Sequence, residues 1–161
     1  MSRTATMPVW EVMSPSPVTV HPDTPVRVLI ALFERLDHNA FPVVDARQVL
    51  CGLVTKLDLL RLLRPDAEFR VPDFADVAGC QVSQIMRRGV VTVEPDDPAA
   101  AAADLMVTTG LRSLPVVERK AGPPVLMGML SRGDLLRGLW VESGGASAAV
   151  TPLAAQTRPQ E

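Results

Sequence analysis

The chain contains an internal repeat, which constrains its fold more than any other feature of the sequence. Residues 12–25 are VMSPSPVTVHPDTP, and residues 85–98 are IMRRGVVTVEPDDP. Seven of these fourteen positions are identical, where chance would give about one. The offset of 73 residues is too long for a solenoid repeat. The sequence therefore predicts two copies of one small domain.

Two further motifs repeat in the same order. FPVVD at 41–45 matches LPVVE at 114–118, and GLVTKLDLL at 52–60 matches GMLSRGDLL at 128–136. The second match has an offset of 76, so three residues are inserted, and the Gly/Pro-bearing stretch 119–124 is the expected place. The predicted units are repeat 1 at 8–64, a linker at 65–81, repeat 2 at 82–141 and a disordered tail at 142–161.

Each repeat has the pattern strand, helix, strand, strand, helix. In repeat 1 the β-branched run Val18–Val20 predicts a short strand, and Pro25 begins a helix with apolar residues at helical spacing. The apolar runs Phe41–Val44 and Val49–Thr55 predict a hairpin, and a closing helix follows at Lys56–Arg64. The corresponding segments of repeat 2 are hairpin strands at Leu114–Val117 and Val125–Leu130 and a closing helix at Arg132–Val141. The short, apolar strands indicate an α/β (α+β) fold, with a small sheet covered by two helices in each repeat and both repeats packed as one module.

The composition argues against several classes of function. The 16 basic and 18 acidic residues give a net charge of −2, which provides no general attraction to nucleic acid or to an anionic membrane. No apolar run reaches the roughly 18 residues that a membrane span needs. Two cysteines and two histidines are too few for a disulfide framework or a Cys/His metal centre, and they indicate a reducing cytoplasm. Nucleophile-elbow, zinc-protease and P-loop motifs are absent from the sequence, so we do not expect an enzyme.

The motifs Thr55-x-x-Asp58 and Ser131-x-x-Asp134 are the strongest candidates for a binding site. Each is expected to follow a strand and to begin a helix, where a hydroxyl and free backbone N–H groups can bind an anion. A carboxylate one turn later can accept two hydrogen bonds from a ribose diol. A purely structural interpretation stays open, because Ser/Thr-x-x-Asp is also close to a helix capping box. The two roles are compatible.

The whole series resembles the tandem cystathionine-β-synthase-type (CBS) domain pair. The resemblance covers about residues 9–140 and is carried, twice and in order, by the Met13 and Met86 openings, the Val-Thr-Val runs, the Pro-Val-Val hairpin entries, and the endings GLVTKLD and GMLSRGD. It implies two repeats about a pseudo-two-fold axis and two clefts that bind adenosine-containing ligands such as AMP, ADP, ATP or S-adenosylmethionine. It also implies a regulatory rather than a catalytic role.

The same resemblance implies which residues bind the ligand. Asp58 and Asp134 would hold ribose, and Thr55 and Ser131 would face phosphate. The first strand of the opposite repeat would line the adenine pocket, and the residues before each Pro-Val-Val would complete the clefts. The implied ligand-binding residues are Thr55, Lys56, Asp58, Thr92, Val93, Pro95, Thr19, Val20, His21, Pro22, Asn39, Ala40, Arg112, Ser113, Ser131, Arg132 and Asp134.

We expect the two clefts to differ in charge, because the repeats differ at two positions near them. Arg112 stands where repeat 1 has Asn39, and Glu94 stands where repeat 1 has His21. We assign Arg112 and His21 to the cleft of Asp134 and the other two residues to the opposite cleft. This is a difference of about two charges, and it predicts tighter binding of di- or triphosphate nucleotides beside Asp134. For His21 a plain surface position is the alternative.

Together these features predict a stand-alone regulatory module. It would require no cofactor, would bind an adenine nucleotide as its regulatory ligand, and would signal to an unidentified regulated protein in trans. The alternative is a ligand-free structural dimerisation or adaptor domain. Surplus apolar residues on the closing helices, such as Leu60, Leu63, Leu136 and Trp140, predict a homodimer. We expect neither nucleic acid nor a membrane as a partner.

Overall fold

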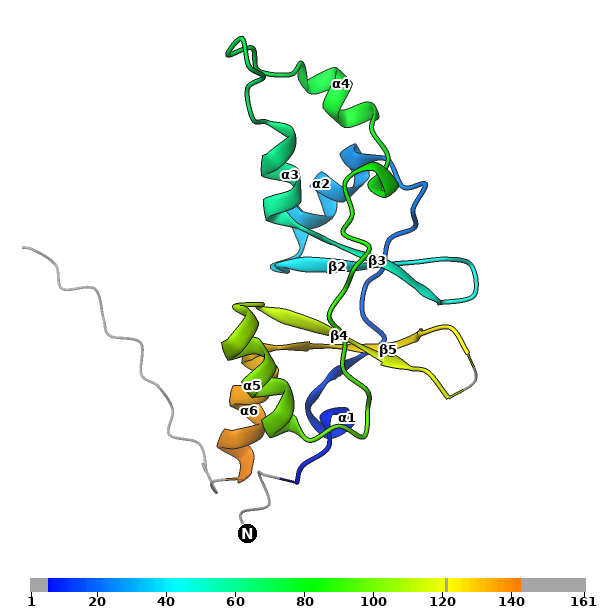
Figure 1. The fold of residues 1–161 in the computed structure, drawn as a ribbon, viewed down its shortest axis with the longest axis vertical. Coiled ribbons are helices and arrows are strands. Elements are labelled where there is room, and N and C mark those ends of the chain that lie inside the picture. Colours follow the sequence, from blue (N-terminus) through cyan, green and yellow to red (C-terminus); the bar gives the residue numbers. More distant parts are fainter. Residues whose placement is uncertain (1–5, 121, 143–161) are drawn as a thin grey trace, which may run out of the picture.

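The computed structural model of the protein describes residues 6–120 and 122–142. Two antiparallel hairpins, one from each repeat, lie side by side in the middle of the molecule, and helices cover them at both ends (Figure 1). The elements in chain order are α1 (Val9–Val12), β1 (Ser14–Pro15), α2 (Val26–Arg35), β2 (Ala40–Val44), β3 (Leu50–Thr55), α3 (Lys56–Leu62), α4 (Phe74–Gly79), the 3-10 helix η2 (Val82–Gln84), α5 (Ala99–Thr109), β4 (Ser113–Glu118), β5 (Val125–Ser131) and α6 (Arg132–Glu142). This arrangement confirms the predicted α/β fold of small sheets covered by helices.

The hairpins of the two repeats have the same register. Thr55 pairs with Ala40 at one end of β2–β3, and Ser131 pairs with Ser113 at the equivalent end of β4–β5. Each hairpin also has a register shift within its Pro-Val-Val run. Every residue of β2 is buried, as the uninterrupted apolar run predicts for a strand that is covered on both faces. The hairpins therefore place the two Ser/Thr-x-x-Asp motifs at equivalent points.

The first strand predicted for each repeat is reduced to a single bridge in the structure. Of Val18–Val20, only Val20 forms a bridge, to Val43 of β2, and Val93 forms the equivalent single bridge in repeat 2. Prolines at 17 and 22 bound this segment, and a proline has no N–H to donate to a strand ladder. Strand β1, which the sequence did not predict, lies upstream instead and pairs with β5 of repeat 2.

The cores of the two repeats exchange segments. Helix α1 begins repeat 1, yet Val9 is fully buried in the core of repeat 2, against residues such as Leu114 and Leu130. Conversely, Val82 and Met86 precede the hairpin of repeat 2 and pack in the core of repeat 1. The predicted boundaries follow the sequence, whereas each core in space is completed by the first segment of the other repeat.

Two glycines allow the exchanged segments to cross the hairpins at close range. A Cβ at Gly52 of β3 would lie 2.7 Å from the carbonyl oxygen of Arg87. A Cβ at Gly128 of β5 would lie 2.8 Å from the carbonyl oxygen of Ser14. Real Cβ atoms essentially never approach backbone oxygens so closely. The repeated glycine of the two motif endings therefore positions Arg87 and Ser14 at equivalent points, 73 residues apart.

Several local predictions are confirmed. Helix α2 begins directly after Pro25, and α5 ends at Gly110, which has the left-handed φ of 73° that favours glycine. The linker contains the short helix α4, whose N-cap Asp73 accepts a hydrogen bond from the backbone N–H of Ala75. The predicted disordered tail lies outside the described residues apart from Glu142, which ends α6.

Candidate ligand-binding site

Asp58 and Asp134 are buried carboxylates, with 3 % and 4 % of their surface exposed. Each caps the helix in which it lies. The backbone N–H of Thr55 donates to Asp58 Oδ2 at 2.9 Å, and the N–H of Asp58 donates to Thr55 Oγ1 at 3.3 Å. The N–H of Ser131 donates to Asp134 Oδ2 at 2.8 Å, and the N–H of Asp134 donates to Ser131 Oγ at 3.1 Å. The capping interpretation of both motifs is therefore confirmed, which leaves a ligand role compatible with it.

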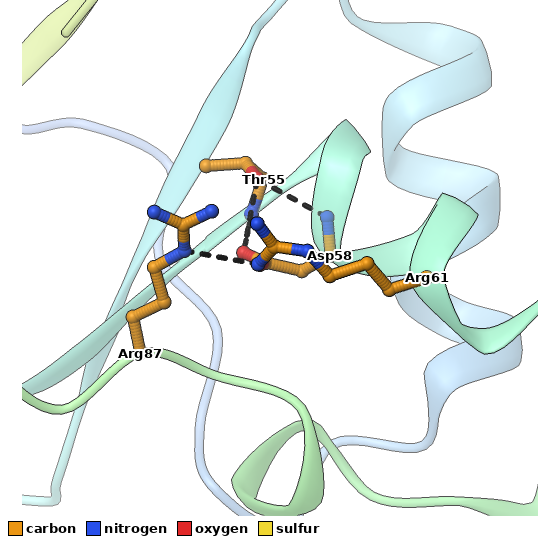
Figure 2. A network of polar contacts seen from close by, with 4 residues as sticks. All are labelled: Thr55, Asp58, Arg61 and Arg87. Carbon is orange, nitrogen blue, oxygen red and sulfur yellow. Dashed lines mark hydrogen bonds and ion pairs between the residues drawn. The ribbon is translucent and has the colours of Figure 1, made fainter.

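The carboxylate of Asp58 also binds two arginines (Figure 2). Arg61 of α3 donates to Oδ1 at 3.0 Å, and Arg87, which arrives from the other repeat, donates to the same oxygen at 3.1 Å. The hydroxyl of Thr55 donates to Oδ2 at 2.9 Å. Each carboxylate oxygen of Asp58 thus accepts two hydrogen bonds.

The carboxylate of Asp134 has a different set of partners. Arg137, the counterpart of Arg61, forms an ion pair with Oδ1. The residue that crosses from the other repeat is Ser14, and its hydroxyl donates to Oδ1 at 3.3 Å. The two buried carboxylates therefore differ most in this crossing residue, which is an arginine beside Asp58 and a serine beside Asp134.

A cavity of about 740 Å³ opens beside Asp134, between the two repeats. This volume lies within the range of pockets that hold small-molecule ligands. The cavity is lined by Ser14, Pro15, Ser16, Pro17, Val18, Asp37, His38, Asn39, Ala40, Pro42, Arg112, Ser113, Met129, Ser131, Arg132, Gly133, Asp134 and Arg137. Apolar prolines, Val18 and Met129 thus share one cavity with a buried carboxylate and three arginines.

The three arginines of this cavity differ in whether their guanidinium groups already have hydrogen-bond or ion-pair partners. The guanidinium of Arg132 donates to the carbonyl oxygens of Leu111 and Gly110 at 3.2 and 3.0 Å, just past the C-terminus of α5. Arg137 is paired with Asp134. The exposed guanidinium of Arg112 has no hydrogen-bond or ion-pair partner within 6–120 and 122–142. Arg112 is therefore the cation best placed to accept an additional anion.

The structure brings seven of the predicted ligand-binding residues together around this cavity. They are Asn39, Ala40, Arg112, Ser113, Ser131, Arg132 and Asp134. Thr55, Lys56 and Asp58 form the equivalent group of repeat 1, at the start of α3. The cavity also includes residues that the sequence analysis did not select, above all Ser14, His38 and Arg137. The repeat could have drawn attention to Ser14, because Ser14 aligns with Arg87 when the two copies are compared.

The segment of repeat 1 that lines the cavity lies just before the residues predicted to contact the adenine. Thr19, Val20, His21 and Pro22 do not line the cavity, and the preceding segment 14–18 does. The reason is that Val20 is buried in the core of repeat 1. The resemblance places Thr92, Val93 and Pro95 in the opposite cleft, so the lining of the cavity beside Asp134 does not test them; Val93 is buried in the core of repeat 2.

The predicted two-charge difference between the clefts does not hold in this form. Asn39 and Arg112 were assigned to opposite clefts, but both line the cavity beside Asp134. His21 lies in an exposed turn, where its backbone N–H donates to Thr24 Oγ1 at 3.0 Å, and it does not line that cavity. The packing of the two repeats against each other brings both positions to one cavity, which sequence offsets alone do not reveal.

Metal binding, membrane-spanning helices and a reactive cysteine are three further features considered for the described part of the chain. Within it, no group of three His, Cys, Asp or Glu side chains could hold a metal ion. No helix there is long and apolar enough to cross a membrane. Partial burial in β3 and, to a lesser extent, the nearby charge of Asp45 raise the pKa of the Cys51 thiol, and Cys51 packs against the core of repeat 1 as a small apolar residue.

Comparisons with known proteins agree with this geometry. The sequence pattern of the CBS domain matches residues 9–65 and 82–141. A CBS domain-containing protein of Dictyostelium discoideum is 34 % identical over 132 residues, which cover 80 % of this chain and 88 % of the relative.

Two solved structures show the same fold. The crystal structure of CBSX2 in complex with AMP has a TM-score of 0.69 and 30 % sequence identity, covering 84 % of this chain and 98 % of CBSX2. The CBS domain pair of protein MJ0100, in complex with 5′-methylthioadenosine and S-adenosyl-L-methionine, has a TM-score of 0.67 and 21 % identity, covering 88 % and 99 % of the two chains. The chain therefore belongs to the CBS domain family and carries two CBS domains in tandem.

Proposed function

We propose that this protein is a regulatory module that binds an adenosine-containing ligand in the cavity beside Asp134. The observation that carries the proposal is a buried carboxylate at the wall of a cavity between the repeats. The same lining contains apolar residues and Arg112, which has no partner in the described part of the chain. A ribose diol supplies the two O–H donors that a carboxylate accepts. The adenosine-containing ligands of CBSX2 and MJ0100 support this class of ligand.

The lining divides into regions that suit the parts of a nucleotide. Asp134 suits the ribose, and Arg112 and the N-terminus of α6 suit a phosphate. Pro15, Pro17 and Met129 offer an apolar surface to the base. The ribose and the base would therefore determine which ligand binds. Arg112, the one arginine of the lining without a partner among the described residues, would respond to the number of phosphates.

We further propose that the protein acts as a homodimer and signals in trans. The closing helices carry exposed large apolar side chains, which suit an interface with a second copy. They are Leu60 of α3, Leu63 at its C-cap, and Leu136, Leu139 and Trp140 of α6. A regulatory role in the energy metabolism of the cytoplasm, without catalysis, is the proposed context. The two free cysteines, Cys51 and Cys80, support a reducing compartment.

Isothermal titration calorimetry with AMP, ADP, ATP, 5′-methylthioadenosine and S-adenosylmethionine tests the ligand class. We expect saturable binding of at least one of them, accompanied by a rise in the melting temperature. Guanosine and cytidine monophosphates serve as matched controls for the base. If none of the adenosine compounds binds, the ligand-free dimerisation or adaptor domain becomes the better account.

A further inference from the structure

The two buried carboxylates differ in their remaining capacity to accept hydrogen bonds. A carboxylate has about four lone-pair sites. Asp58 accepts four hydrogen bonds, from the N–H and hydroxyl of Thr55, from Arg61 and from Arg87. Asp134 accepts from the N–H of Ser131, from Arg137 and from the hydroxyl of Ser14, within the described residues. Asp58 is therefore fully occupied by the chain itself, and Asp134 is not.

The partners that cross from the other repeat also differ in strength. Arg87 brings a positive charge to Asp58, so its hydrogen bond is reinforced by the attraction between opposite charges. Ser14 brings a neutral hydroxyl at the longer distance of 3.3 Å, and a hydroxyl hydrogen rotates readily to another acceptor. A ribose diol can displace Ser14 from Asp134 more easily than Arg87 from Asp58.

The position of Arg87 is fixed by its backbone rather than by its side chain. Its N–H donates to the carbonyl of Leu53 at 2.9 Å, and the N–H of Leu53 donates to its carbonyl at 2.9 Å. Gly52 allows this close crossing, as described above. The backbone of Arg87 is thus held beside β3, within reach of Asp58, and a substitution of its side chain leaves these backbone bonds intact.

We propose that Arg87 closes the cleft of Asp58 to ribose, so that each chain binds one adenosine-containing ligand, beside Asp134, rather than two. This inference rests on the proposed function. It makes position 87, with its counterpart at position 14, the residue that decides which of the two clefts accepts the ligand. An arginine at this position stays bound to the aspartate carboxylate, whereas a serine leaves the carboxylate accessible to ribose.

Exchange of the two residues tests this directly by calorimetry with AMP and with adenosine. Adenosine is included because it has no phosphate that could bind Arg87. For the wild type we expect one ligand per chain. For Arg87→Ser we expect a second ligand per chain, with an affinity within about tenfold of the first. For Ser14→Arg we expect binding beside Asp134 to weaken by about ten- to a hundredfold.

Arg88→Ser is the matched control, because it removes a neighbouring exposed arginine that does not contact Asp58, and it should leave the wild-type stoichiometry unchanged. Thermal unfolding verifies that each variant is folded, and Asp58 keeps Arg61 and Thr55 as partners in Arg87→Ser. Two ligands on the wild-type chain, or one ligand on a folded Arg87→Ser chain, would overturn this inference alone. No binding of either compound to any variant would overturn the proposed function as well.

Discussion

Asp134 combines two roles at the scale of a single residue. Its carboxylate caps α6 and at the same time lies in the wall of the cavity. The capping function belongs equally to Asp58, whose carboxylate binds Arg87. A comparison of the two aspartates therefore separates the loss of a helix cap from the loss of a ligand contact.

We expect Asp134→Ala to weaken the binding of AMP by about ten- to a hundredfold, because it removes hydrogen bonds to a charged acceptor. Asp58→Ala should leave AMP affinity within about twofold of the wild type. Both variants should lose roughly 0.5–2 kcal/mol of stability with the cap. Calorimetry and chemical denaturation of each variant measure the two effects. Equal losses of affinity in both variants would contradict the distinction between the clefts.

Arg112 offers a second prediction at this scale. Its guanidinium is exposed and unpaired among the described residues, so it can bind the additional phosphates of ATP. We expect Arg112→Ala to lower the ratio of ATP affinity to AMP affinity by roughly two- to fivefold, since exposed ion pairs contribute about 0.2–1 kcal/mol.

The effect of Arg112→Ala should shrink as salt is added. Arg88→Ala, which removes an exposed cation outside the cavity lining, is the control. The prediction fails if the ratio is the same in the wild type and in Arg112→Ala at low salt.

At the scale of the elements, the crossing of each exchanged segment over a hairpin depends on one glycine. We expect Gly52→Ala and Gly128→Ala each to lower the free energy of unfolding by about 1–3 kcal/mol, because the new methyl group would meet a backbone oxygen at 2.7 or 2.8 Å. Gly89→Ala is the control, because a Cβ there meets nothing within 4 Å. It should be neutral or stabilising by about 0.4–1 kcal/mol. Urea denaturation measures all three, and a neutral Gly128→Ala would show that the crossing adjusts freely.

The sequence predicted the elements whose signals are local. The two hairpins follow from apolar runs separated by short turns, and α2 and α5 follow from a proline start and, in α5, a glycine end. Helix α1 was missed, because its four residues are too few for a periodic pattern and it is buried only by contacts with repeat 2. The run Val18–Val20 has strong strand propensity, but flanking prolines leave it a single bridge.

The candidate site was predictable in part for the same reason. Asp134 and its Ser131 cap lie within one motif, so the sequence identified them. The opposite wall depends on which residues of the other repeat pass the cavity, and this follows from tertiary packing of Val20 rather than from any local pattern. The decisive contrast between Arg87 and Ser14 was visible in the aligned repeats, but only the structure shows that both side chains contact the aspartates.

At the scale of the whole molecule, the exposed apolar side chains beside α3 and on α6 predict association. Leu60 is 59 % exposed and Leu136 is 66 % exposed. We expect light scattering at micromolar concentration to give the mass of a dimer, and Leu136→Glu to shift it toward the monomer, because a charge would be buried in the interface. Phe69→Ser removes an apolar residue of the linker that is even more exposed, at 86 %, and should leave the mass unchanged. A monomeric wild type would contradict the prediction.

The central claim is that an adenosine-containing ligand binds beside Asp134 and not beside Asp58. A crystal structure of the protein grown with excess AMP tests it most directly. We predict one AMP per chain in the cavity between the repeats, with its ribose hydroxyls within about 2.5–3.0 Å of the Asp134 carboxylate and its phosphate near Arg112, while Arg87 remains bonded to Asp58. AMP bound through Asp58 with Arg87 displaced, or a cavity beside Asp134 without AMP, would contradict the claim.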